Sequence, residues 1–146
     1  MYLTEAEFKE RYSVKHYQKV IQGDRLVADA TTRFNLISSE VSEIIDSSLN
    51  MRYEVPLDPI PTVIKGYAAV LINYRAVQYN DGGLTEVETV SYENAIKAIQ
   101  DYRATTRELT DSDGIIDDYQ SKRVYSTGGS ISTEKDVGKI NKYFVT

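Results

Sequence analysis

The hydrophobic and polar positions of this chain repeat with the period of amphipathic helices. Between Asp29 and Asn50 the apolar residues step by threes and fours, while polar residues occupy the opposite face. The apolar positions are Phe34, Ile37, Val41, Ile44, Ile45 and Leu49, and the polar ones are Ser39, Glu40, Glu43 and Asp46. The pattern predicts a long helix that is capped by Asp29 and turns one face to a core.

Two more long helices are predicted downstream. Residues 67–72 are apolar all round, which indicates that the helix over residues 62–80 is central and covered on most sides. Residues 80–83, Asn-Asp-Gly-Gly, end it. Thr85 and Glu88 then form a capping box for a helix to about Glu108. Its predicted buried positions are Tyr92, Ala95, Ile96, Ile99 and Tyr102.

Two short helices precede these three. Thr4 and Glu7 form a capping box for a helix to about Tyr12, and Ser13 can cap a second one over residues 14–22, which Gly23 ends. Residues 24–28 are predicted to be a loop, with Leu26 and Val27 as a small apolar plug.

All three prolines, Pro56, Pro59 and Pro61, fall within residues 50–61. Proline fixes φ, lacks a backbone donor and disfavours helix in the residue before it, so the first long helix must end near residues 50–53. The next helix can begin at Pro61, because first-turn donors have no intrahelical partner. Residues 50–61 are therefore predicted to form a rigid connection, which we call the elbow.

These elements predict an all-α fold, a small antiparallel bundle of three long helices with short N-terminal helices, over residues 1–109. From Thr110 onward, breaker clusters at residues 111–114 and 127–130, and Gly138, interrupt any helical period. Residues 110–146 are predicted to form an extended C-terminal arm, partly β or disordered, that orders against a partner.

The net charge of −5 is unevenly distributed. Residues 119–146 hold five basic and two acidic residues, a balance of +3, so residues 1–118 carry −8. An acidic body argues against general nucleic-acid binding by the body. The basic arm can dock on an acidic neighbour or remain solvated. With no cysteine, no signal-like leader and no long apolar run, the chain is expected to be a soluble intracellular protein without a membrane span.

No pattern supports catalysis, a cofactor or a metal. His16 is the only histidine and is expected at the surface. The acidic residues that begin at Asp111 do not match a calcium loop, since glycine falls fourth and the twelfth residue is Lys122. Nucleophile-elbow and phosphate-loop patterns are lacking, so we expect a protein that is not an enzyme.

The twelve tyrosines favour protein interfaces, because tyrosine is amphipathic and loses little entropy when it is fixed. Tyr67, Tyr92 and Tyr102 are assigned to the core. For the other tyrosines, placement at the edge of the core is the alternative. The candidate interface residues are Arg52, Tyr53, Tyr119, Arg123, Tyr125, Lys139, Lys142, Tyr143 and Phe144. Arg52 can pair with a carboxylate of its own subunit or cross an interface.

The order of the parts carries a family resemblance. The opening Met-Tyr-Leu-Thr-Glu-Ala-Glu-Phe precedes an Asp-capped helix that ends in Leu-Asn-Met-Arg-Tyr-Glu-Val-Pro-Leu at residues 49–57, followed by Pro-Ile-Pro at residues 59–61. This resembles the Mu-like prophage structural family, whose members resemble head–tail connector (adaptor) proteins of tailed phages. The resemblance covers residues 2–109. Residues 123–126 match a late Arg-aromatic step only weakly, and the arm is longer and richer in Gly and Ser than the family's usual ending.

The resemblance implies a helical subunit of a ring, commonly twelve-fold, between the portal and the tail-completion or neck proteins. DNA would pass through the ring without specific binding, and the subunit would reside in the virion neck after assembly in the host cytoplasm. The alternative is a small cytoplasmic helical domain that binds proteins or has a regulatory role.

Overall fold

The computed structural model describes residues 1–80 and 82–104, and every regular element in this part of the chain is a helix. In chain order they are α1 (Glu5–Tyr12), α2 (Val14–Tyr17), the π-helical η1 (Gln18–Gln22), α3 (Val27–Leu49), α4 (Thr62–Tyr79) and α5 (Glu86–Arg103). The predicted all-α fold is confirmed for these residues. The arm at residues 110–146 and the boundary before it lie outside the described residues.

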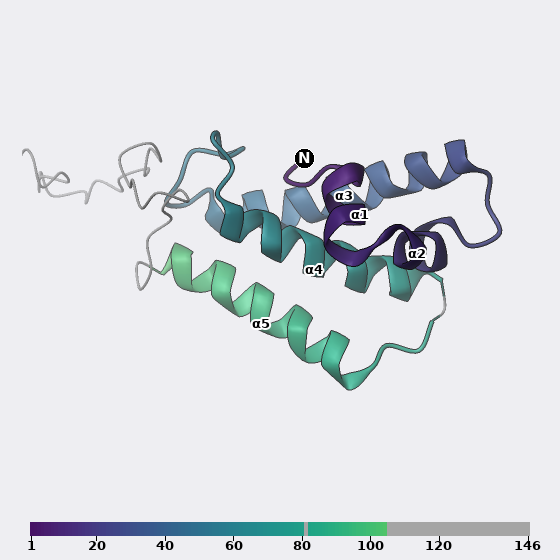
Figure 1. Cartoon of the computed structure of the whole chain (residues 1–146). Coiled ribbons are helices and arrows are strands. Elements are labelled where there is room, and N and C mark those ends of the chain that lie inside the picture. The colour runs from purple at the N-terminus through teal and green to yellow at the C-terminus, as the bar shows by residue number, and fades with distance from the viewer. Residues whose placement is uncertain (81, 105–146) are drawn as a thin grey trace, which may run out of the picture.

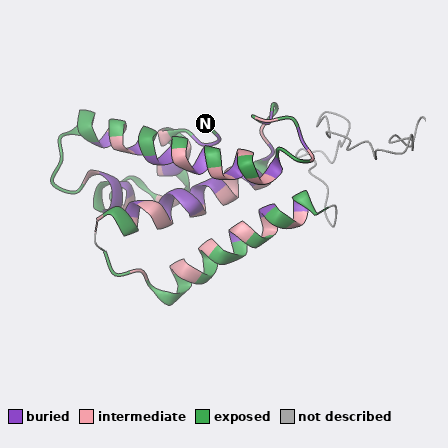
Figure 2. Ribbon diagram, turned by 180° about the vertical axis from the view of Figure 1, so that it is seen from behind, coloured by how far each residue is buried: buried purple, intermediate pink, exposed green. Residues whose placement is uncertain are grey.

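Helix α4 is the centre of the bundle. It runs antiparallel to α3, and α5 packs against both of these helices, while α1 lies over α3 (Figure 1). Ala68, Ala69, Leu71 and Ile72 are at most 1% exposed, and the ribbon of α4 is the most continuously buried (Figure 2). The apolar centre of this helix therefore identified the central element correctly.

Two predicted capping boxes are present. The Thr4 Oγ1 accepts from the Glu7 N–H at 3.2 Å, and the Thr85 Oγ1 accepts from the Glu88 N–H at the same distance. In both, the glutamate side chain accepts in return from the backbone N–H of the threonine. Each box satisfies donors that a helix N-terminus leaves without partners.

The predicted start of α3 was wrong. Leu26, not Asp29, is its N-cap, and Asp29 lies in the first turn, where a carboxylate favours the helix dipole. The Ala30 N–H bonds to the Leu26 carbonyl at 3.0 Å and so extends the helix upstream. Leu26 and Val27 are 74% and 70% exposed, which also contradicts the predicted apolar plug.

The second short helix changes its type along its length. Ser13 caps α2 as predicted, but residues 18–22 form a π-helical turn, closed by a 2.8 Å bond from the Gly23 N–H to the Gln18 carbonyl. A π turn holds an extra residue. Tyr17, Val20 and Ile21 are all buried, an arrangement that the wider turn accommodates.

Helix α5 packs against the rest of the bundle with only a narrow face, and most of its residues are exposed or half-buried (Figure 2). Ala95, Ile99 and Tyr102 are buried as predicted, but Tyr92 and Ile96 are only half-buried, because α5 lies at the edge of the bundle. The Tyr92 ring stacks on that of Tyr74 with centroids 4.0 Å apart. Ile44 of α3 is likewise half-buried, and α5 ends at Arg103 rather than near Glu108.

Candidate functional site

The elbow, residues 50–61, is where the two ends of the described chain meet. The Tyr2 hydroxyl accepts from the Leu57 N–H at 2.9 Å and donates to the carboxylate of Asp46 near the end of α3. Tyr2 is 2% exposed, and burial raises the pKa of its hydroxyl, with the Asp46 hydrogen bond adding to the effect. One phenol thus joins the N-terminus, α3 and the elbow. The peptide bonds before Pro56 and Pro59 are cis.

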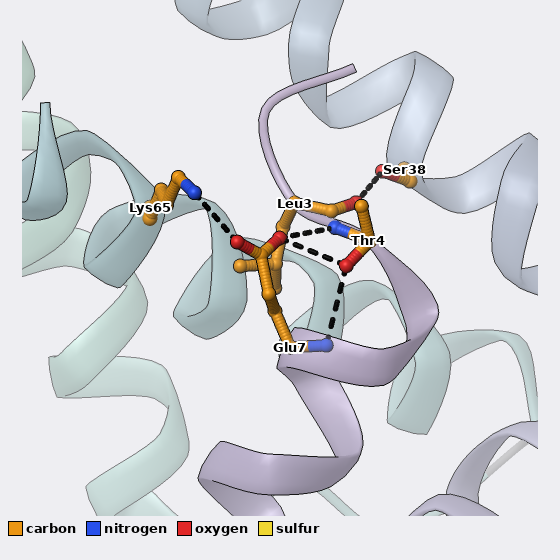
Figure 3. A network of polar contacts seen from close by, with 5 residues as sticks. All are labelled: Leu3, Thr4, Glu7, Ser38 and Lys65. Atoms are coloured by element: carbon orange, nitrogen blue, oxygen red, sulfur yellow. Dashed lines mark hydrogen bonds and ion pairs between the residues drawn. The ribbon is translucent and has the colours of Figure 1, made fainter. Parts of the chain in front are cut away.

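Two buried serines continue this network along α3. The Tyr2 N–H donates to the Ser42 hydroxyl at 3.2 Å, and Ser42 donates to the Ser38 carbonyl at 2.8 Å. Ser38 in turn donates to the Leu3 carbonyl at 3.1 Å (Figure 3). The burial of these two serines, and of Tyr2 and Leu3, was not predicted. For the serines, the available signal was their position beside Ile37 and Val41 on the apolar face of the helix.

Glu7 ties α1 to the first turn of α4. Its carboxylate lies 2.5 Å from the Lys65 Nζ and also accepts from the Thr4 N–H at 2.8 Å (Figure 3). The Lys65 hydrogen bond, followed by the bonds within the capping box, lowers the pKa of Glu7 to about 2. This carboxylate therefore remains ionised over the whole neutral range.

Arg52 joins the elbow to the end of α5. Its Nη1 donates to the Tyr102 carbonyl at 2.8 Å, and its guanidinium lies 5.3 Å from the centroid of the Tyr53 ring. The carbonyls of the last helical turn have no intrahelical partner, so the arginine satisfies one of them. This contact lies within the subunit. The two alternatives expected for Arg52, a carboxylate of its own subunit or an interface, stay predictions.

The other candidate interface residues fall into two groups. Tyr53 is 3% exposed and belongs to the core. Its side chain is therefore not on the surface of the subunit, where an interface residue would have to lie. Tyr53 belongs to the same buried hydrophobic cluster as Leu49 and Leu57. The remaining residues, Tyr119, Arg123, Tyr125, Lys139, Lys142, Tyr143 and Phe144, lie outside the described residues.

His16 is not the surface residue that was expected. It is half-buried, its Nε2 lies 2.6 Å from the Asn73 Oδ1, and its ring stacks on Tyr12 at 5.2 Å. Asn73, only 8% exposed, lies on the central helix α4. His16 therefore connects α2 to α4, and this contact could not be read from its basic neighbours in the sequence.

The elbow combines buried apolar residues with exposed residues, two of them acidic. Met51, Glu54 and Asp58 are exposed, while Tyr53 and Leu57 anchor the segment below them. Among residues 1–80 and 82–104, no cluster of three His, Asp or Glu side chains is placed to hold a metal ion. None of the helices described has the length and apolarity that a bilayer crossing needs.

Comparison with known proteins gives one family match. A family model described as Bacteriophage Mu, Gp36 matches residues 2–114. The match begins at Tyr2 and spans every described helix as well as the elbow. No curated protein matches the chain significantly.

Proposed function

The chain belongs to the bacteriophage Mu Gp36 family, and on this premise we propose that it is a head–tail connector (adaptor) subunit of a tailed phage or prophage. Copies of the subunit form a ring, commonly twelve-fold, between the portal and the tail-completion or neck protein. The ring resides in the virion neck and is assembled in the host cytoplasm. Its role is structural and involves no catalysis.

The family match over residues 2–114 is the observation that carries this proposal. The internal ties of the subunit support it. Tyr2, Glu7 and Arg52 fix the N-terminus, α1 and the end of α5 to the elbow and to α4. Such a pre-organised subunit suits a protein that acts through its surfaces, because little conformational freedom is lost on assembly.

The acidic charge of the subunit is compatible with a DNA conduit. Residues 1–118 carry a net charge of −8. An acidic wall repels phosphate and offers it no basic ligands, so DNA can pass without specific binding.

The test is the mass of the full-length chain in solution, alone and with the cognate portal protein. Native mass spectrometry and light scattering should show a ring-sized species, or a ring that forms on the portal and co-elutes with it. Portal protein alone is the control. A chain that stays monomeric at every concentration and does not bind the portal protein would contradict the connector role and favour a monomeric binding domain.

A further inference from the structure

Two segments at opposite ends of the helical bundle carry opposite net charge. The segment from α2 to the start of α3 lies at one end, and the elbow lies at the other (Figure 1). Helix α3, with 23 residues, spans the distance between them, roughly 35 Å at 1.5 Å per residue. The two charged surfaces are therefore well separated on one subunit.

We define the basic end by Lys15, Lys19, Arg25 and Arg33. The first three are exposed and Arg33 is half-buried. Residues 13–33 contain these four basic residues and two acidic ones, Asp24 and Asp29, for a balance of +2. Val14, Leu26 and Val27, at least 54% exposed, add apolar surface to this end.

Two arginines of the basic end contact the same uncharged acceptor. The Arg25 Nη1 and the Arg33 Nη2 lie 3.5 Å and 3.0 Å from the same Asn80 Oδ1, which carries no charge. Neither arginine forms an ion pair with any residue in the described ranges. Burial, and then the charge of Arg25, lower the pKa of Arg33. A carboxylate from outside the subunit would relieve this repulsion.

We define the acidic end by Glu43, Asp46, Glu54 and Asp58. Residues 43–58 contain these four acidic residues and one basic residue, Arg52, for a balance of −3. The Tyr2 hydroxyl contacts both Asp46 and the Leu57 N–H, which places Asp46 of α3 close to the part of the elbow that carries Asp58. Met51, 55% exposed, adds apolar surface here too.

We propose that the basic end of one subunit packs on the acidic end of the next, so that copies of this chain associate head to tail. This inference rests on the proposed ring function and names the surfaces that build the ring. A heterologous contact between two different surfaces closes into a ring when its rotation allows. The exposed apolar residues of the two ends would form the centre of the contact, and the charges around them would set its orientation.

The test exchanges the charges of the two ends in the full-length chain. One variant carries Lys15→Glu, Lys19→Glu and Arg25→Glu, so that both ends are acidic. The other carries Glu43→Lys, Glu54→Lys and Asp58→Lys, so that both are basic. Each variant alone should assemble at least ~10-fold more weakly than the wild type, because like charges now face each other. An equimolar mixture should recover assemblies in which the two variants alternate.

Native mass spectrometry identifies such mixed assemblies by mass. The controls are Lys97→Glu and Glu93→Lys, which reverse exposed charges on α5 outside both ends and should leave assembly unchanged. Wild-type assembly should also weaken between 50 and 500 mM salt, as screening predicts. Circular dichroism checks that each variant folds. For a triple variant that does not, the single changes Lys19→Glu and Asp58→Lys replace it.

Several outcomes would overturn the inference. If the variants assemble like the wild type, or if mixing them does not restore assembly, the basic end of one subunit does not pack on the acidic end of the next. If only the acidic-end variant fails to assemble, another occupant, such as the basic residues 119–146, binds there instead. In each case a wild-type ring would leave the connector function standing. A wild type that never assembles, even with portal, would overturn both proposals.

Discussion

At the scale of single residues, a few polar side chains hold distant segments together. The Tyr2 hydroxyl is 55 residues from Leu57 and 44 from Asp46 in sequence, and it bonds to both. A buried donor or acceptor that loses its partner costs free energy. Removing such a residue therefore destabilises the fold by more than the loss of its hydrogen bonds alone. Through these two bonds Tyr2 holds the N-terminus against both α3 and the elbow.

Replacing Tyr2 by Phe should lower the free energy of unfolding by about 2 kcal/mol, because the Leu57 N–H and the Asp46 carboxylate lose a buried partner. Urea unfolding followed by circular dichroism measures the change. Tyr79→Phe is the matched control, since it removes an exposed bond to Glu40 and should cost less than about 0.5 kcal/mol. Equal effects of the two changes would refute the role given to Tyr2.

Glu7 should make stability depend on acid pH. Its pKa falls from about 4.5 to about 2 on folding, so its contribution is complete above pH 4.5 and is lost as the pH drops toward 2. Glu7→Gln should therefore cost about 1 kcal/mol at pH 6 and clearly less at pH 3. Urea unfolding at both pH values tests this. Glu10→Gln, at an exposed position of α1, should show no such difference.

At the scale of elements, backbone conformation decides where glycine is needed. Gly23 ends η1 at φ +54°, a region that side chains disfavour, whereas Gly66 lies inside α4 with ordinary helical geometry. A Cβ at Gly66 would meet only the tip of the Arg11 side chain, at 3.4 Å. The two glycines therefore have different roles, although both belong to helical segments.

Gly66→Ala should raise the free energy of unfolding by about 0.5–1 kcal/mol, because alanine favours a helix interior. Gly23→Ala should lower it by about 1 kcal/mol, because φ stays positive at that position. Thermal unfolding of both variants beside the wild type gives the two signs. A stabilised Gly23→Ala variant would show that the end of η1 tolerates another backbone conformation.

At the scale of the whole molecule, one core accounts for the described part of the chain. The buried hydrophobic residues run from Tyr2 to Tyr102 and form a single cluster. Every described helix contributes to it, and the elbow adds Tyr53 and Leu57. This core lies inside the domain that the sequence predicts for residues 1–109.

A chain cut after Leu109 should therefore still unfold in one cooperative transition, with a Tm within about 4 °C of the full-length value. Calorimetry of the two chains compares them. Loss of the cooperative transition would place residues 110–146 among those that the core requires. Assembly need not survive the same cut, so ring formation should be measured separately.

The sequence by itself determined the helices and the central position of α4. Periodicity, two capping boxes and clustered prolines are local signals, and they set the ends of α4 and the starts of α1 and α5 closely. The prediction from sequence was wrong where packing overrides local preference, as at the start of α3 and in the π turn of η1. The interface residues beyond residue 104 remain predictions.

Only the tertiary structure decided which polar residues are buried and what they bind. Ser38, Ser42, His16 and Tyr2 each bond to partners at least 35 residues away, and no local pattern encodes such pairs. It also turned Tyr53 inward and placed residues 13–33 and the elbow at opposite ends of the bundle. Local sequence sets backbone preferences, whereas the partner of a side chain is set by the packing of the whole chain.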